Sequence, residues 1–265
     1  FTAPNLLSIS GTGSISNLNV NSPFGIDLLG DQTITNSLQL NQGLINTGSN
    51  KLILSDVAAV TGGSTTSHVN GNVQRLFTNA NPGTYLLPIG DGNRYAPLLL
   101  GPSINIGGDG YVTAFTTAND HPDVANSGIS ATKSVNRTWT ITNNSLGFSE
   151  CDVTFNWDPA DVDGIATQTN FILAKLDGTA WTLPAGVVPG VNTLYVGNLN
   201  SFSQFQIGQP ACVVNIPDAN FKTALLANAL INTNSDGEIQ CAEATAYTGT
   251  INVSNASIAD LTGIE

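Results

Sequence analysis

Residues 15–54 read ISNLNVNSPFGIDLLGDQTITNSLQLNQGLINTGSNKLIL. Apolar and polar residues alternate along several short stretches of this segment, and a period of two is typical of β-strands. Glycine and asparagine, which favour turns, separate the stretches. The alternating stretches are Ile15–Val20, Gly25–Leu29, Thr33–Leu40, Gly43–Thr47 and Lys51–Leu54.

The same segment carries a second, longer period. Leu38 lies 20 positions after Leu18, and Ile45 lies 19 positions after Ile26. A repeat of about 20 residues with several short strands is typical of a parallel β-helix, in which each coil buries its apolar residues against the next. We therefore expect residues 1–68 to form the end of a β-helix-like solenoid. An antiparallel sandwich of evenly spaced hairpins is the alternative interpretation.

The pattern changes after the low-complexity stretch Thr61–Ser67. Beyond it the alternating stretches are longer and more aromatic, and turn signals separate them at intervals of about 8–12 residues. This spacing predicts an antiparallel, Ig-like β-sandwich over residues 69–208. Its expected core includes the aromatic residues Trp139, Phe155, Trp157, Phe171 and Trp181.

Residues 209–265 hold the one convincing helical pattern of the chain. Asp218 is a good N-cap residue, and Phe221, Leu225 and Leu226 begin an apolar stripe with helical spacing. We therefore expect a helix over Asp218–Ile231 within a small α/β cap.

The segment after this helix, Asn232–Glu243, reads NTNSDGEIQCAE and matches the calcium loop of an EF-hand. Calcium takes six to eight hard oxygen ligands, and this spacing wraps such ligands around one point. Gly237 stands at the sixth position, where the loop turns sharply. The candidate metal ligands are Asn232, Asn234, Asp236, the backbone carbonyl of Glu238, Gln240 through a water molecule, and Glu243 as the bidentate ligand.

The loop is expected to bind calcium weakly and in a structural role. Asn232 replaces the aspartate usual at the first position, and few negative charges surround the ion. We therefore expect a dissociation constant of about 10⁻⁴–10⁻³ M, the range of extracellular modules. A polar helix–helix connection without an ion is the alternative.

The three cysteines leave their redox state open. Cys212 and Cys241 lie 29 positions apart on either side of the predicted helix. Either a disulfide or two small buried thiols fits this placement. Cys151 stands alone on a predicted strand and is expected in the core.

Composition excludes several classes of function. Charged residues are 10% of the chain, and 7 basic against 19 acidic residues give a net charge of −12. So few basic residues cannot neutralise a phosphate backbone, which excludes nucleic acid as a partner. No apolar run approaches the ~20 residues of a membrane helix, so we expect no membrane insertion.

No catalytic constellation is recognisable, so we predict that the chain is not an enzyme. Motifs of serine hydrolases, zinc proteases and nucleotide-binding proteins are missing from the sequence. His68 and His121 lack partners at informative spacing and are expected in loops. Asp158, Asp161 and Asp163 fit no complete ligand pattern and are expected in a solvated turn.

The last residues, Thr250–Glu265, read TINVSNASIADLTGIE, and their apolar spacing resembles the start of an internalin-type leucine-rich repeat. Val214–Glu265 as a whole resembles the cap and first repeat of surface leucine-rich repeat proteins of Bacteroidetes. Gly71–Arg75, Tyr85–Gly90 and Phe202–Gly208 resemble β-sandwich segments of large secreted proteins of that phylum, which the type IX secretion system typically exports.

The resemblance implies an extracellular, cell-surface location and a role in adhesion or attachment. We expect a structural, non-catalytic segment whose calcium loop stiffens the joint between its modules. Its expected partners are surface glycans or other surface proteins, and the type IX secretion machinery. A carbohydrate-binding module, or an accessory region of a polysaccharide-degrading enzyme, is the alternative.

Overall fold

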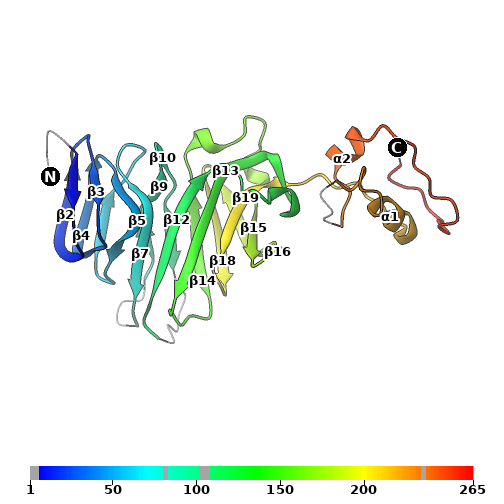
Figure 1. Ribbon diagram of the computed structural model, residues 1–265. Coiled ribbons are helices and arrows are strands. Elements are labelled where there is room, and N and C mark those ends of the chain that lie inside the picture. Colours follow the sequence, from blue (N-terminus) through cyan, green and yellow to red (C-terminus); the bar gives the residue numbers. More distant parts are fainter. Residues whose placement is uncertain (1–5, 80–82, 102–107, 234–236, 265) are drawn as a thin grey trace.

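The computed structural model describes residues 6–79, 83–101, 108–233 and 237–264. This part of the chain is mainly β, and its strands follow one another in a row that ends in two short helices (Figure 1). The strands are β1 (Leu7–Ile9), β2 (Gly13–Asn21), β3 (Ile26–Leu28), β4 (Gln32–Gln42), β5 (Ile45–Leu54), β6 (Ala59–Gly62), β7 (Val69–Phe77), β8 (Tyr85–Leu87), β9 (Ile89–Asp91), β10 (Arg94–Tyr95), β11 (Leu98–Gly101), β12 (Gly110–Ala118), β13 (Ile129–Asn144), β14 (Cys151–Asn156), β15 (Ile172–Asp177), β16 (Ala180–Thr182), β17 (Val187–Gly190), β18 (Thr193–Leu199) and β19 (Gln204–Pro210). The α-helices are α1 (Ala219–Leu226) and α2 (Cys241–Ala246), and three short 3₁₀ helices, η1 (Val124–Asn126), η2 (Pro159–Asp161) and η3 (Gln168–Asn170), lie in loops between the strands.

Strands β1–β7 form a solenoid of about four turns. Leu18 on β2 pairs with Leu38 on β4, and Ile26 on β3 pairs with Ile45 on β5, both in parallel register. The period found in the sequence is therefore the register of the sheet. The predicted β-helix-like solenoid is confirmed, and the hairpin alternative is wrong for this segment because its neighbouring strands run parallel.

The stacking of coils requires apolar residues inside the solenoid and glycine at a tight corner. Leu18, Leu38 and Leu52 are at most 2% exposed inside the solenoid. At a corner between coils, Gly43 has φ of 92°, and a Cβ there would lie 1.8 Å from the carbonyl oxygen of Ser22. Only glycine fits at this corner, because any side chain would collide with the backbone of the preceding coil.

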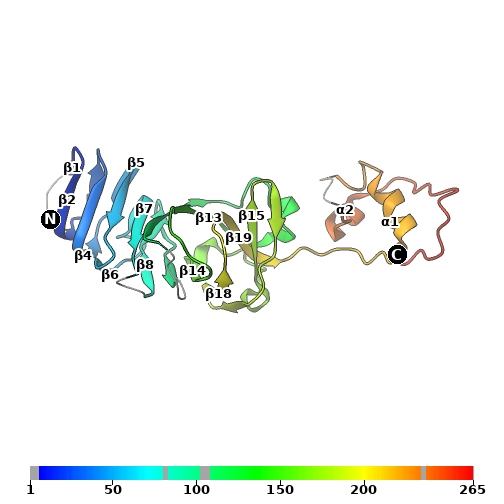
Figure 2. The same cartoon turned by 90° about the horizontal axis from the view of Figure 1, so that it is seen from below.

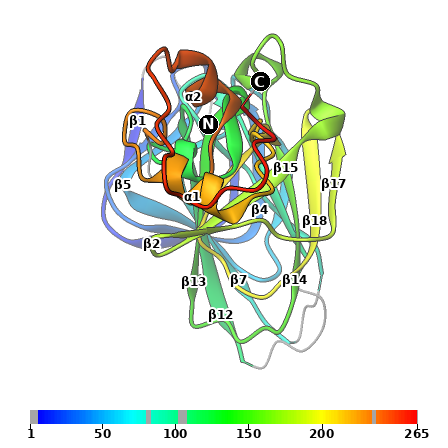
Figure 3. The same cartoon turned by 90° about the vertical axis from the view of Figure 1, so that its right-hand side faces the viewer.

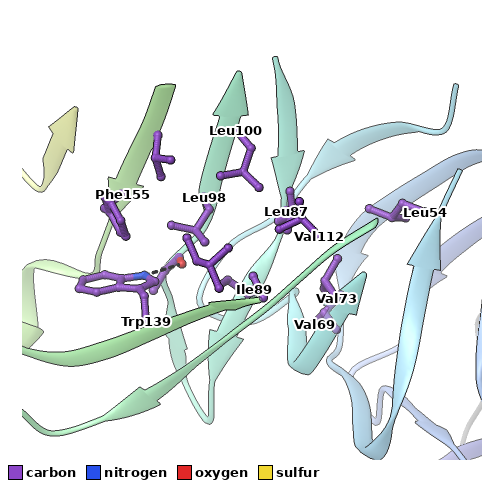
Figure 4. Close-up of a cluster of buried hydrophobic side chains, with 14 of the residues drawn as sticks. Leu54, Val69, Val73, Leu87, Ile89, Leu98, Leu100, Val112, Trp139 and Phe155 are labelled. Carbon is purple, nitrogen blue, oxygen red and sulfur yellow. Dashed lines mark hydrogen bonds between the residues drawn. The ribbon is translucent and has the colours of Figure 1, made fainter. Parts of the chain in front are cut away.

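The following strands form two facing antiparallel layers. One continues from β7 in the order β7–β12–β13–β19–β15–β16, and the other has the order β17–β18–β14–β11–β8. Their inner faces share one hydrophobic core, in which Trp139 packs edge-on against Phe155 at 5.4 Å between ring centroids (Figure 4). The aromatic core predicted from the sequence is confirmed for Trp139, Phe155, Trp157 and Phe171.

Trp181 was expected in this core, and that prediction is wrong. Trp181 on the edge strand β16 pairs with Leu176, whose side chain lies on the opposite face of the sheet from Leu173 of the core. Its ring meets His121 edge-on at 5.1 Å, and its indole N–H donates to Oδ2 of Asp123 at 2.8 Å. Trp181 therefore stays outside the core because its strand lies at the edge of the sheet and its side chain points away from the second layer.

The solenoid and the two layers share one core. Strand β7 pairs in parallel with β5 and antiparallel with β12, so it belongs to both arrangements. Figure 4 shows Leu54 and Val73 in line with Val112 and the residues around Trp139. The pairing direction therefore changes across β7 (Val69–Phe77), with buried apolar side chains on both sides of this strand.

The C-terminal part lies at the end of the row, beyond the two layers, in both Figure 1 and Figure 2. It has a separate core made of Ile216, Phe221, Leu225, Ile231 and Ile239. Helix α1 begins after Asp218 as predicted, but it ends at Leu226 rather than Ile231. The side chain of Asn228 accepts a hydrogen bond from the backbone of Leu230 at 3.0 Å, which favours a turn over further helix.

Residues 250–264 form turns and bends without a helix or strand. Three apolar residues of the predicted repeat, Ile251, Val253 and Ile258, pack against the C-terminal core. The apolar spacing is thus used for packing, and the leucine-rich repeat stays a prediction.

Candidate metal site in the C-terminal cap

The candidate loop is held between α1 and α2. The carboxylate of Asp218 caps α1 by accepting hydrogen bonds from the backbone of Asn220 and Phe221, both at 2.9 Å. Its other oxygen accepts from the backbone of Ala259 at 2.8 Å and of Asp260 at 3.2 Å. These donors, Ala259 first, lower the pKa of Asp218. One aspartate therefore fixes the start of the helix and the end of the chain segment that packs on it.

Asn232, at the first position of the loop, is 6% exposed. Its Nδ2 donates to the carbonyl oxygen of Leu226 at 3.3 Å, which fixes the side-chain amide. Its Oδ1 is buried and accepts no hydrogen bond among the described residues. A buried amide oxygen without a donor is costly, so this atom calls for a positively charged or hydrogen-bonding partner.

Glu243, at the last position, is 8% exposed and faces back into the loop. Its Oε1 accepts hydrogen bonds from the backbone and the hydroxyl of Thr233, at 2.7 and 2.8 Å. Its Oε2 accepts from the backbone of Gln240 at 3.0 Å and forms a capping box with that residue. The carboxylate therefore joins the beginning of the loop to its end.

The other predicted ligands have varied surroundings. Glu238 is half-buried, and its Oε1 accepts from Nζ of Lys222 at 2.6 Å, so its side chain points to α1 and leaves the backbone carbonyl as its candidate ligand. Gln240 is the N-cap of α2. Gly237 has φ of 86°, as the sixth loop position requires. Asn234 and Asp236 lie outside the described residues.

A disulfide joins Cys212 to Cys241 and closes the loop from the side, which resolves the alternative that the sequence left open. Around it the backbone of Cys241 donates to the carbonyl of Cys212 at 2.8 Å, and that of Val214 donates to Ile239 at 2.8 Å. The segment entering the cap is thus pinned along the far end of the loop. Cys151 is a buried free thiol, as predicted, and burial raises its pKa to about 12.

The residues present fit a hard cation. The unpartnered oxygen of Asn232 and the buried carboxylate of Glu243 are the ligand types calcium prefers. Oε1 of Glu243 already accepts two hydrogen bonds from Thr233, and Oε2 accepts one from the backbone of Gln240, so a metal bound here would share these oxygens with protein donors or replace those donors. No group of three or more His, Cys, Asp or Glu side chains that could hold a metal occurs among the described residues, which leave out Asp236.

The acidic stretch Asp158–Asp163 has a structural role. Asp161 is 6% exposed, and its Oδ2 accepts from Nε of Arg137 at 2.8 Å while its Oδ1 lies 3.3 Å from Nε of Arg94. Asp163 accepts from Nδ2 of Asn136 at 2.8 Å. The prediction of a solvated turn is therefore wrong, because cations and amides distant in sequence fold against these carboxylates.

The two histidines differ from each other. His121 lies in a loop, as predicted, where Gln206 accepts from its backbone at 2.8 Å. His68 also lies in a loop, in the bend before β7, but its side chain is fully buried, with Nδ1 2.9 Å from the carbonyl oxygen of Ser64 and its ring stacked on Tyr95. Burial lowers the pKa of His68.

Comparison with protein families, with curated proteins and with solved structures finds no match to this chain. In the part of the chain that the structure describes, no helix is long and apolar enough to span a membrane.

Proposed function

We propose that this chain is a non-catalytic structural and adhesive segment of a large secreted cell-surface protein, with a calcium-stabilised joint. Two features support a mechanical role. The solenoid and the layers share one hydrophobic core, so they resist bending as a unit. The cap is fastened separately, by a disulfide and a loop that closes on Glu243.

The observation that carries the proposal is the buried, unpartnered Oδ1 of Asn232 in a loop with EF-hand spacing. The side chains of Asn232, Asn234, Asp236 and Glu243, the carbonyl of Glu238 and a water on Gln240 would hold the ion. Calcium supplies positive charge and coordination to these oxygens. Glu243 holds the two ends of the loop together through its hydrogen bonds to Thr233 and Gln240.

The finer assignments rest on the sequence patterns. We propose that residues 69–208 are an Ig-like sandwich and that residues 209–265 are a cap leading into a leucine-rich repeat. By resemblance, the parent protein is a Bacteroidetes surface protein exported by the type IX system. The Cys212–Cys241 disulfide supports an extracellular location, because disulfides persist in oxidising compartments.

Calcium titration of the full chain tests the joint. Isothermal calorimetry is expected to show one site with a dissociation constant of about 10⁻⁴–10⁻³ M. Glu243→Gln removes the bidentate charge and should weaken binding at least about tenfold. Glu150→Gln, an exposed acid on the layers, is the matched control and should leave binding unchanged.

Asn232→Asp gives a second test, because its expected effect on the stability of the cap is opposite in the absence and in the presence of calcium. Without calcium it buries a carboxylate and should lower the melting temperature of the cap. With calcium it adds a ligand charge and should tighten binding. Calcium binding that is equal in wild type, Asn232→Asp and Glu243→Gln would refute the site.

The second candidate function is a carbohydrate-binding module or an accessory region of a polysaccharide-degrading enzyme. One observation favours it, namely the polar hollow beside the buried Lys175.

A further inference from the structure

A hollow of about 460 Å³ lies between the two layers, at the end where β15 and β16 face the end of β18. Figure 3 shows β15 and β18 on the same side of the molecule. This volume falls within the range of about 300–1,000 Å³ that is usual for small-molecule sites. Polar side chains reach it from both layers and from the turn after β18. They are Lys175, Asp177, Thr182, Asn198, Asn200 and Ser201.

Lys175 is the feature that packing alone does not explain. It alternates with Leu173 on β15 and lies opposite Phe205 on β19, so it occupies a core-facing position. Lys175 is only 5% exposed. A buried ammonium is costly unless it is paired and hydrogen-bonded, and an aliphatic residue would fill this position without that cost.

The ammonium of Lys175 is only partly satisfied. Among the described residues it donates to Oδ2 of Asp177 at 2.8 Å and to the hydroxyl of Ser201. A lysine ammonium has three donors, so one N–H remains for a ligand in the hollow. Asp177 uses Oδ2 for the lysine, and its Oδ1 has no donor among the described residues. The wall of the hollow therefore presents a donor beside an acceptor.

The charges select an uncharged ligand. Lys175 and Asp177 together carry no net charge, so neither an anion nor a cation gains from both groups. A hydroxyl group accepts and donates at once, and two neighbouring hydroxyls match the Lys175 and Asp177 pair. Asn198 and Asn200 add amide groups that can bond further hydroxyls.

We propose that this hollow is a binding site for a neutral carbohydrate, in which neighbouring ring hydroxyls bridge Lys175 and Asp177. The site binds without reacting, because Lys175 is a paired ammonium that donates to Ser201 and so cannot take a proton from it. It shares no residue with the calcium loop, so each of the two assignments can fail alone.

Saturation-transfer NMR on the full chain tests the proposal. The probes are the methyl glycosides of glucose, galactose and mannose, and N-acetylglucosamine, with glucuronate as the anionic arm. At least one neutral sugar is expected to bind with a millimolar dissociation constant, and glucuronate is expected to bind more weakly than the methyl glycoside of glucose.

Two variants and one control locate the site. Asp177→Ala removes an acceptor whose side chain is 47% exposed and should weaken binding about tenfold or more. It also leaves the ammonium of Lys175 with Ser201 as its partner and should lower the melting temperature, so binding is measured below that temperature. Lys175→Met keeps the shape of the buried stem and should abolish binding. Asp31→Ala breaks the other lysine–aspartate pair, Lys51–Asp31 on the solenoid, and should change nothing.

If Lys175→Met does not fold, sugar binding by Asp177→Ala compared with Asp31→Ala still tests whether the hollow is the binding site. Three results would overturn the proposal: no neutral sugar binds, sugar binds equally well to Asp177→Ala, or glucuronate binds more tightly than the neutral glucoside.

Discussion

Breaking the bond between Cys212 and Cys241 is expected to release the C-terminal cap and leave the sheets folded. The disulfide closes a loop with a sequence separation of 29. In the chain-entropy treatment such a loop contributes about 3.6 kcal/mol at 25 °C. The core of the cap has only five buried apolar side chains among the described residues, and a core of a small module rarely supplies more than about 3–5 kcal/mol. Without the disulfide the cap should therefore be close to the midpoint of unfolding.

Amide hydrogen exchange measures this directly. In the doubly substituted chain, Cys212→Ser with Cys241→Ser, the amides of α1 should exchange about 400-fold faster than in the wild type, which is 3.6 kcal/mol expressed as a rate ratio. The amides of β13 and β19 should exchange at unchanged rates, because they lie in the other core. Unchanged exchange in α1, or equal loosening of β13, would refute the reasoning.

Three further predictions concern the rest of the chain. Leu38→Ala, at 0% exposure inside the solenoid, should lower the free energy of unfolding by about 2–5 kcal/mol in denaturant titration; Val57→Ala, at an exposed site, should change it by less than about 0.5 kcal/mol. Asp161→Ala leaves the fully buried Arg137 without its carboxylate and should lower the melting temperature, at a cost of about 3–5 kcal/mol. Because burial lowers the pKa of His68 from 6.5 in the folded state, the unfolded state binds more protons, so stability should fall as pH drops below about 6.5; His68→Gln should remove up to about 1.4 kcal/mol per pH unit of that slope.

The solenoid was predictable because its signal is periodic and local. Each coil repeats the same apolar positions, so the spacing between Leu18 and Leu38 was enough to predict that they pair. The N-cap at Asp218 was predictable for the same reason, since its partners lie two and three residues away.

What the sequence did not reveal depends on contacts distant in the chain. The burial of Asp161 depends on Arg137 and Arg94, and the position of Trp181 outside the main core depends on which strand ends the sheet. In the candidate metal site the spacing predicted that Glu243 is a calcium ligand, and this stays a prediction. The hydrogen bonds by which Glu243 joins Thr233 to Gln240 carried no sequence signal.

Lys175 carried a signal that pattern analysis passed over. It is a single cation inside the apolar strand ILAKLD, at a position whose alternation points to the core. A charged residue at a core-facing strand position is unusual. The sequence does not show that Lys175 lines a hollow, because the other lining residues, such as Asn198 and Ser201, come from the end of β18 and the turn after it.

Pulling single molecules by their ends tests the mechanical role most directly, first with calcium and then with a chelator, and with the Cys212–Cys241 disulfide reduced so that the calcium loop carries the force. The account predicts that the cap yields first, at a force that calcium raises, and that solenoid and layers then unfold together because they share one core. Separate rupture of the solenoid from the layers, or a cap that yields at the same force with and without calcium, would contradict it.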